Sequence, residues 1–167
     1  MISNFTITEP ILIAIGQIAD SAGVEAYVVG GFVRDVLLER GNDRDIDITV
    51  IGDGVAFAKR VASEFAGAKL AVYEKFRTAL VEIGELKIEF VGARKESYRS
   101  DSRNPITEEG SLEEDLSRRD FTVNALAVSI NSATLGNIVD LFNGLTDLES
   151  RILRTPLDPL ITFEDDP

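Results

Sequence analysis

The chain has 167 residues, a formal net charge of −12, and neither cysteine nor histidine. This composition excludes disulfides, thiolate zinc sites and every mechanism that needs an imidazole, serine triads included. Carboxylates, lysines, arginines, hydroxyls and oxygen-bound metals remain as candidate catalytic groups. Proteins that bind nucleic acid on their own are usually basic, so the acidic balance argues against a free-standing nucleic-acid binder. With no visible secretory signal or membrane-spanning run, we expect a soluble, cytoplasmic protein.

The first part of the chain alternates between helical and strand patterns. Pro10, which follows Thr8 and Glu9, marks a helix start, and Gly23 marks a helix end. The expected elements are a helix over about 8–22, a strand over 25–29, a helix over 32–39, a strand over 44–50 and an amphipathic helix from Gly52 to about Ala66.

The second part predicts strands interrupted by a long polar segment. Strands are expected over Lys69–Tyr73, Thr78–Ile83 and 86–91, with a hairpin turn at Gly84. Residues 94–118 lack periodicity and predict a connecting segment, and 95–117 hold so few apolar residues that we expect mobility there, whether functional or not. A helix over 120–127, a hairpin over 128–140, a short helix near 145–150 and a strand near 152–155 follow. The fold class is therefore α/β or α+β with a mixed sheet.

Two aspartates in the stretch NDRDIDITVIG give the clearest chemical signal. Alternate strand residues point to the same face, so Asp45 and Asp47 share one face while the apolar residues between and after them point into a core. Side-by-side carboxylates are stable next to a divalent cation, and two metals about 3.5–4 Å apart are typical of phosphoryl transfer. A solvated strand face is the alternative. An EF-hand is excluded because Ile48 and Gly54 stand where that loop needs glycine and glutamate.

A glycine pair precedes these aspartates, in VVGGFVRDVLLE. Gly30 and Gly31 lie between an expected strand and an expected helix. Glycine there lets the backbone approach a ligand, and a helix start offers N–H groups to phosphate. Arg34, one turn into the helix, can reach the same place. An ordinary strand-to-helix turn is the alternative, and neither a P-loop nor a dinucleotide fingerprint is present.

The order G-G-x-V-R-D-x-L-L followed by D-x-D resembles the first signature of the nucleotidyltransferase superfamily to which DNA polymerase beta belongs. More closely, it resembles the class II CCA-adding enzymes and the bacterial poly(A) polymerases. RRDFTVNALA at 118–127 looks like their second signature, and DLFNGLTDL at 140–148 looks like their third. The resemblance extends from about Tyr27 to Pro167. It implies a polymerase beta-like nucleotidyltransferase fold, with a mixed central sheet flanked by helices.

The resemblance also implies roles for the matching residues. Asp45 and Asp47 would be catalytic and would hold Mg²⁺, with two ions bound during catalysis. The triphosphate would be bound by Gly30, Gly31 and Arg34. The nucleotide sugar and phosphate would be bound by Arg119, Asp120 and Asn124, which would also favour ribose. The residues themselves indicate a part of this: arginines at a helix start can pair with phosphate, and Asp120 and Asn124, four residues apart, share a helix face. A capped helix with a surface salt bridge is the alternative.

Three further acidic residues belong to the expected site. Glu89 is the candidate third carboxylate because it points away from the apolar row of its strand, although an exposed strand glutamate would look the same. Asp165 and Asp166 match the start of the signature that selects the base in the resembling family, whose arginine would follow Pro167. The third signature, with Asp140, Gly144 and Asp147, would shape the link to the next domain or simply form a turn and a helix cap.

We expect residues 1–155 to form a catalytic head domain and 156–167 to begin a linker to a helical neck and body that this chain lacks. The resemblance implies template-independent transfer of CMP or AMP from CTP or ATP to a tRNA or other RNA 3′ hydroxyl, with release of pyrophosphate. The missing domains would hold most of the RNA, which accounts for an acidic head. CCA addition, A-addition, CC-addition and poly(A) synthesis stay open, as does a non-catalytic nucleotide-binding module of the same fold.

Overall fold

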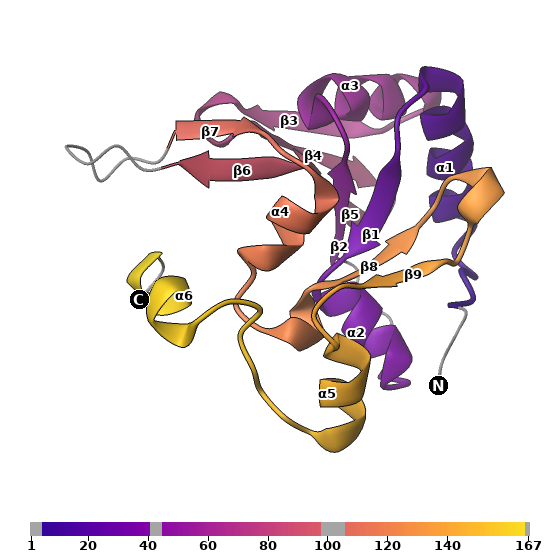
Figure 1. The fold of residues 1–167 in the computed structure, drawn as a ribbon. Coiled ribbons are helices and arrows are strands. Elements are labelled where there is room, and N and C mark those ends of the chain that lie inside the picture. Colours follow the sequence, from indigo (N-terminus) through magenta and orange to yellow (C-terminus); the bar gives the residue numbers. More distant parts are fainter. Residues whose placement is uncertain (1–4, 41–44, 98–105, 166–167) are drawn as a thin grey trace.

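A seven-stranded mixed sheet forms the centre of the chain, with helices packed against it (Figure 1). The computed structural model describes residues 5–40, 45–97 and 106–165. The strand order is β3-β4-β5-β2-β1-β8-β9, with β1 Ala26–Val29, β2 Asp45–Val50, β3 Lys69–Tyr73, β4 Thr78–Ile83, β5 Leu86–Gly92, β8 Leu126–Ser129 and β9 Ile138–Asp140. Among the described strand pairs of this sheet, β2 and β5 run parallel and the rest antiparallel. The predicted fold class, a mixed sheet flanked by helices, is confirmed.

The remaining elements are short helices and one hairpin beside the sheet. They are α1 Pro10–Ala22, α2 Gly31–Leu37, α3 Gly54–Glu64, α4 Leu112–Ser117, α5 Gly144–Ser150, α6 Pro159–Asp165, the 3₁₀ turns η1 Glu74–Phe76, η2 Thr122–Asn124 and η3 Ser132–Thr134, and the paired strands β6 Arg94–Ser97 and β7 Ile106–Glu109. As predicted, α1 ends at Gly23, which has a left-handed backbone with φ 67°. Within the described residues, no helix combines the length and the apolar character needed to cross a membrane.

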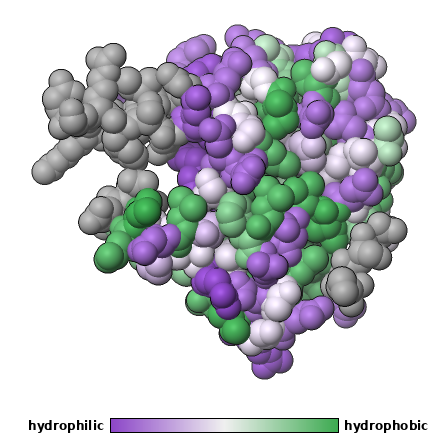
Figure 2. All heavy atoms as spheres, in the orientation of Figure 1, coloured by the Kyte–Doolittle hydropathy of each residue, from purple (hydrophilic) through white to green (hydrophobic). Residues whose placement is uncertain are grey.

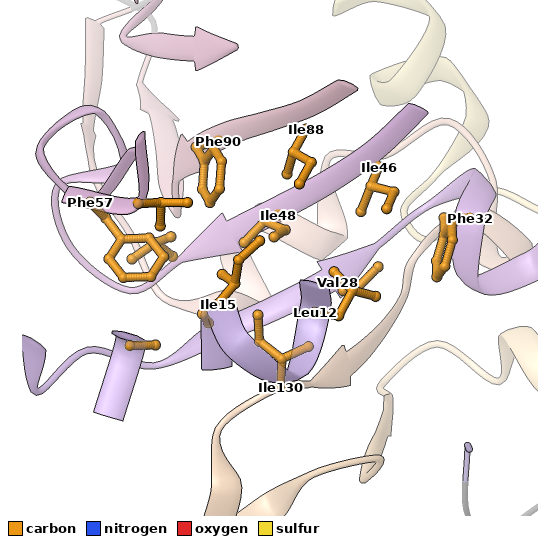
Figure 3. Close-up of a cluster of buried hydrophobic side chains, with 14 of the residues drawn as sticks. Leu12, Ile15, Val28, Phe32, Ile46, Ile48, Phe57, Ile88, Phe90 and Ile130 are labelled. Carbon is orange, nitrogen blue, oxygen red and sulfur yellow. The ribbon is translucent and has the colours of Figure 1, made fainter. Parts of the chain in front are cut away.

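The two faces of the sheet are covered unequally. On one face, α1 and α3 bury the alternating apolar residues of the central strands, such as Ile46, Ile48 and Phe90 (Figure 3). Phe57 of α3 meets Phe90 edge to face, with ring centroids 5.8 Å apart. The opposite face carries only a small buried cluster, where Leu116 of α4 packs against residues of β1 and β8. The exposed end of β2 therefore lies on a face that the helices leave partly open.

The segment 94–118 is not a featureless connection, and this prediction was wrong. It contains β6, β7 and α4. The helix begins with a capping box in which Ser111 and Glu114 satisfy each other's backbone N–H groups, and Leu112 and Leu116, four residues apart, face the sheet. This segment forms regular structure with few apolar residues, because β6 and β7 are held together by pairing of their backbones. The mobility expected over 95–117 stays a prediction: the described part of this stretch lies in or beside β6, β7 and α4, and 98–105 lie outside the described residues.

Two further element predictions were wrong. The predicted helix over 120–127 is the 3₁₀ turn η2 followed by strand β8. All four residues of β8 are buried, so they show no alternating pattern, and pairing with β1 decides their conformation. The segment 152–155 forms no strand: it is held to the rest of the fold by single contacts, such as the hydrogen bond from Thr122 N–H to the Arg154 carbonyl, at 2.7 Å.

Candidate active site

Three carboxylates line the open face of the sheet at β2 and β5. Asp45 and Asp47 are exposed while Ile46 and Ile48 between and beyond them are fully buried, which confirms the predicted shared face. Glu89 pairs in register with Asp47 across the parallel β2–β5 ladder, so its side chain is on the same face. As expected, Glu89 is exposed and its neighbours in the strand are buried.

Crowding of negative charge marks this face electrostatically. Desolvation raises the pKa of Asp47, and the charges of Glu89 and Asp45 raise it further, while the Arg119 guanidinium opposes them. Part of the Asp47 side chain still reaches solvent. Like charges held in this way favour a cation between them.

The donor set fits a hard divalent cation in its chemistry. All three groups supply carboxylate oxygens, which Mg²⁺ and similar ions prefer. Among the described residues, no three carboxylates converge tightly enough to hold a metal ion by themselves. A metal here would therefore draw on Asp45 and Asp47 and complete its coordination with oxygens from water or ligand.

A glycine turn lies beside these carboxylates. Gly30 has φ 73° and ψ −137°, a backbone conformation that L side chains rarely adopt. A Cβ atom there would lie 2.9 Å from Arg119 Nη1 and 3.7 Å from Asp47 Oδ2. Gly31 has no positive φ, and its Cβ would meet Arg34 Nη2 at an ordinary 3.5 Å. Of the two predicted glycines, only Gly30 is therefore required by the geometry.

The first and second signatures are joined by a chain of side-chain contacts. Arg34 Nη1 donates to Asn124 Oδ1 at 2.6 Å, and its Nε and Nη2 donate to the two carboxylate oxygens of Asp35, each at 2.9 Å. Asn124 Nδ2 in turn donates to Asp120 Oδ1 at 3.0 Å. Asp120 and Asn124, predicted to share one face of a helix, do lie together, although a 3₁₀ turn and not an α-helix brings them there. The sequence interpretation missed Asp35, which fixes the Arg34 side chain.

Arg119 connects this network to the carboxylates. Its guanidinium lies over Gly30, and its Nη2 is 3.6 Å from Oδ2 of the buried Asp115. Its Nε is buried and has no hydrogen-bond partner among the described residues. A positive group so placed can meet an anion above the turn. The sequence interpretation also missed Asp115, because the segment that holds it was expected to be irregular.

The two aspartates of the third signature make structural contacts. Asp140 accepts hydrogen bonds from Gly144 N–H at 2.7 Å and Leu145 N–H at 3.0 Å, and so caps α5. Asp147 is 2% exposed and accepts a hydrogen bond from Thr122 Oγ1 at 2.7 Å, with Arg154 Nε 3.3 Å away. These contacts fasten α5 to the turn η2, which carries Asn124.

The C-terminal segment presents apolar side chains to solvent. The exposed large residues there are Ile152, Leu153, Leu157, Leu160, Ile161 and Phe163, and Figure 2 shows hydrophobic atoms gathered at α6. Phe163 touches Phe121 of the second signature edge to face, at 6.5 Å between ring centroids. The predicted base-selecting acids are not placed: Asp166 and the Asp165 side chain lie outside the described residues.

Residues 26–154 match the model of a family described as the poly A polymerase head domain. The chain is 43% identical over 142 residues to an A-adding tRNA nucleotidyltransferase of Aquifex aeolicus, which covers 85% of this chain and 17% of that protein. It is 41% identical over 152 residues to a CCA-adding enzyme of Lactobacillus helveticus, covering 90% and 36% respectively. The chain thus spans only a minor part of these curated relatives.

Solved structures show the same similarity. A Thermotoga maritima CCA-adding enzyme complexed with tRNA superposes with a TM-score of 0.79 at 36% identity, covering 95% of this chain and 34% of that one. A tRNA nucleotidyltransferase complexed with a primer tRNA and an incoming ATP analogue gives 0.77 at 40% identity, covering 92% and 41%.

Proposed function

Because the chain belongs to the poly A polymerase head-domain family, we propose that it is the catalytic head of a tRNA nucleotidyltransferase. It transfers CMP or AMP from CTP or ATP to an RNA 3′ hydroxyl and releases pyrophosphate. The observation that carries this proposal is the exposed pair Asp45 and Asp47, set beside the Gly30 turn and the Arg119 guanidinium. The names of the relatives, A-adding and CCA-adding enzymes, support the same reaction. In this proposal residues 1–155 form the head, and 156–167 begin a linker.

Members of this family normally use divalent metal ions. We propose Mg²⁺, held by Asp45 and Asp47 with Glu89 close by. When bound, such ions lower the pKa of the attacking hydroxyl and neutralise the departing phosphate oxygens. The carboxylates of the chain supply the negative charge that keeps the cations on the open face.

The other residues bind and orient the nucleotide. The missing side chain at Gly30 leaves room for the Arg119 guanidinium, which offers its N–H groups to a phosphate from above the turn. Arg34 and Asp120 both hold Asn124, so that its position is fixed before the ribose arrives. Preorganised polar groups of this kind cost little rearrangement when the substrate binds.

The acidic character of the chain implies that RNA is held elsewhere. With a net charge of −12 the head releases few counterions from a phosphate backbone, so it should bind tRNA weakly by itself. The curated relatives are much longer than this chain, and we propose that the part of such proteins outside the head supplies that affinity.

The central test is removal of charge from the aspartate pair. Asp45→Asn and Asp47→Asn, made in the complete protein, should each lower incorporation of labelled CMP and AMP into a tRNA without its 3′ end by about 10³-fold or more. Asp53→Asn is the matched control, because Asp53 is an exposed acid that caps α3 away from the site. Near-normal rates in both site variants would overturn the proposal.

A further inference from the structure

Asp115 occupies an unusual position for a carboxylate that no signature includes. It lies on α4 and is 4% exposed, against the same face of β2 that carries Asp45 and Asp47. Its Oδ2 accepts a hydrogen bond from Thr49 Oγ1 at 3.3 Å, and Thr49 is two residues beyond Asp47 on the strand. A buried carboxylate is costly unless it is paired, so a specific partner is required.

That partner is Arg119, one helical turn further along the chain. Arg119 Nη2 lies 3.6 Å from Asp115 Oδ2. The other end of the same guanidinium, Nη1, passes over the Cα of Gly30, where even a methyl group would be too close. Arg119 therefore spans the distance between a buried carboxylate and the turn beside Asp47.

The arrangement solves a problem specific to this site. An arginine next to two exposed carboxylates would ordinarily fold onto them and form ion pairs. Such pairs would occupy the oxygens that a cation needs. Among the described residues Arg119 forms its ion pair with the buried Asp115 and none with Asp45 or Asp47, and its guanidinium lies above Gly30, from where its charge still acts on Asp47.

We propose that Asp115 is a positioning residue that holds the Arg119 guanidinium above Gly30, where it meets a nucleoside triphosphate and leaves the aspartate pair open to the metal. The proposal rests on the proposed function, since it assigns a support to the same site. Asp115 itself does not touch the nucleotide. Its effect on binding is transmitted through Arg119.

A purely structural role would look different. If Asp115 only anchored α4 to β2, its removal would weaken the fold and disturb the site whether or not Arg119 was present. If it acts through Arg119, its removal should matter only while Arg119 is there. A double-mutant cycle separates the two cases.

The cycle compares wild type, Asp115→Asn, Arg119→Ala and the double variant, with the affinity for Mg²⁺·ATP measured by calorimetry and melting temperatures recorded in parallel. Asp115→Asn should weaken binding about tenfold in the wild-type background and less than about twofold in the Arg119→Ala background. Asp115→Glu keeps the charge and should recover most of the affinity. Equal losses in both backgrounds, or equal losses for Asn and Glu, would overturn the inference.

A second measurement needs no ligand. The Nε–H group of Arg119 is buried, so its NMR signal should be protected from exchange with water in the wild type and should lose that protection in Asp115→Asn. Thr49→Val provides a milder change, because it removes only the hydroxyl that contacts Asp115. It should weaken Mg²⁺·ATP binding about two- to threefold, again only when Arg119 is present. Unchanged protection in Asp115→Asn would contradict the proposed contact.

The outcomes also distinguish this inference from the function it rests on. If wild type fails to bind Mg²⁺·ATP, the proposed function is wrong. If wild type binds and the cycle is additive, only the role of Asp115 is wrong.

Discussion

Two groups of aspartates in this chain have opposite surroundings. Asp45 and Asp47 are exposed on β2, and the charges nearest to Asp47 include those of Asp45 and Glu89. Asp115 on α4 and Asp147 on α5 are buried, and each contacts one threonine hydroxyl and one arginine. The first group is arranged so that a ligand can stabilise it. The second group is already satisfied by the protein and holds the elements around the site in place.

The largest stability effect should come from the buried group. Asp147→Ala removes the acceptor of the Thr122 hydroxyl and detaches α5 from η2, so it should lower the free energy of unfolding by about 2–3 kcal/mol. Its ion pair with Arg154 adds little, because the Arg154 side chain is 62% exposed. Urea denaturation measures the difference. Asp45→Ala, the exposed counterpart, should change stability by less than about 0.5 kcal/mol. A similar loss of stability in both variants would contradict the difference between the exposed and the buried aspartates.

The glycine turn gives a smaller effect and a matched pair of variants. Gly30→Ala forces a side chain into a left-handed backbone and toward Arg119, which should cost about 1–2 kcal/mol of stability and also weaken triphosphate binding. Gly31→Ala has room for its methyl group and an ordinary φ, so it should be nearly neutral for stability. Thermal unfolding and nucleotide titration of both variants check the expectation. Equal behaviour would mean that Arg119 does not cross the turn as described.

Removing a charge from the exposed pair should raise the stability of the fold, whereas removing a buried aspartate lowers it. Asp47→Asn removes a charge that desolvation and two like charges disfavour, so the metal-free chain should become more stable at neutral pH. The gain should be at most about 0.5–1 kcal/mol, since solvent screens the site and Arg119 partly compensates. Differential scanning calorimetry without divalent ions measures it. Destabilisation by Asp47→Asn would show that the carboxylate is supported by the protein itself.

Replacement of Asp20 should give the smallest change in stability. This aspartate represents a third kind of surrounding, since it is exposed and yet hydrogen-bonded by the protein. It is exposed, but hydrogen bonds from Ser132 and Asn131 hold its pKa below the ordinary value. A lowered folded-state pKa stabilises the fold above the unfolded-state pKa, and this contribution disappears as pH falls through the folded-state pKa. Asp20→Asn should therefore lower the melting temperature slightly at neutral pH, with the difference shrinking toward pH 2. A difference that did not depend on pH would exclude the charge as its origin.

The sequence predicted what depends on neighbours along the chain. The shared face of Asp45 and Asp47 and the end of α1 at Gly23 follow from periods and turn chemistry that a few residues determine. The conformation of β8 could not be predicted from its own residues, because pairing with β1 overrides the helical pattern of this segment. Asp115 was missed for the same reason. Its hydrogen-bond partner Thr49 is 66 positions away, and no local pattern indicates that contact.

The parallel pairing of β2 and β5 determines when the site can exist at all. Parallel neighbours cannot be joined by a tight turn, and here α3, β3 and β4 all lie between them in the chain. Asp47 and Glu89 are thus brought side by side only after a long-range closure, a slow kind of contact to form during folding. A growing or partly folded chain holds these carboxylates apart. The proposed binding of a metal–nucleotide complex therefore requires the completed sheet, because only then do the carboxylates of β2 and β5 lie side by side.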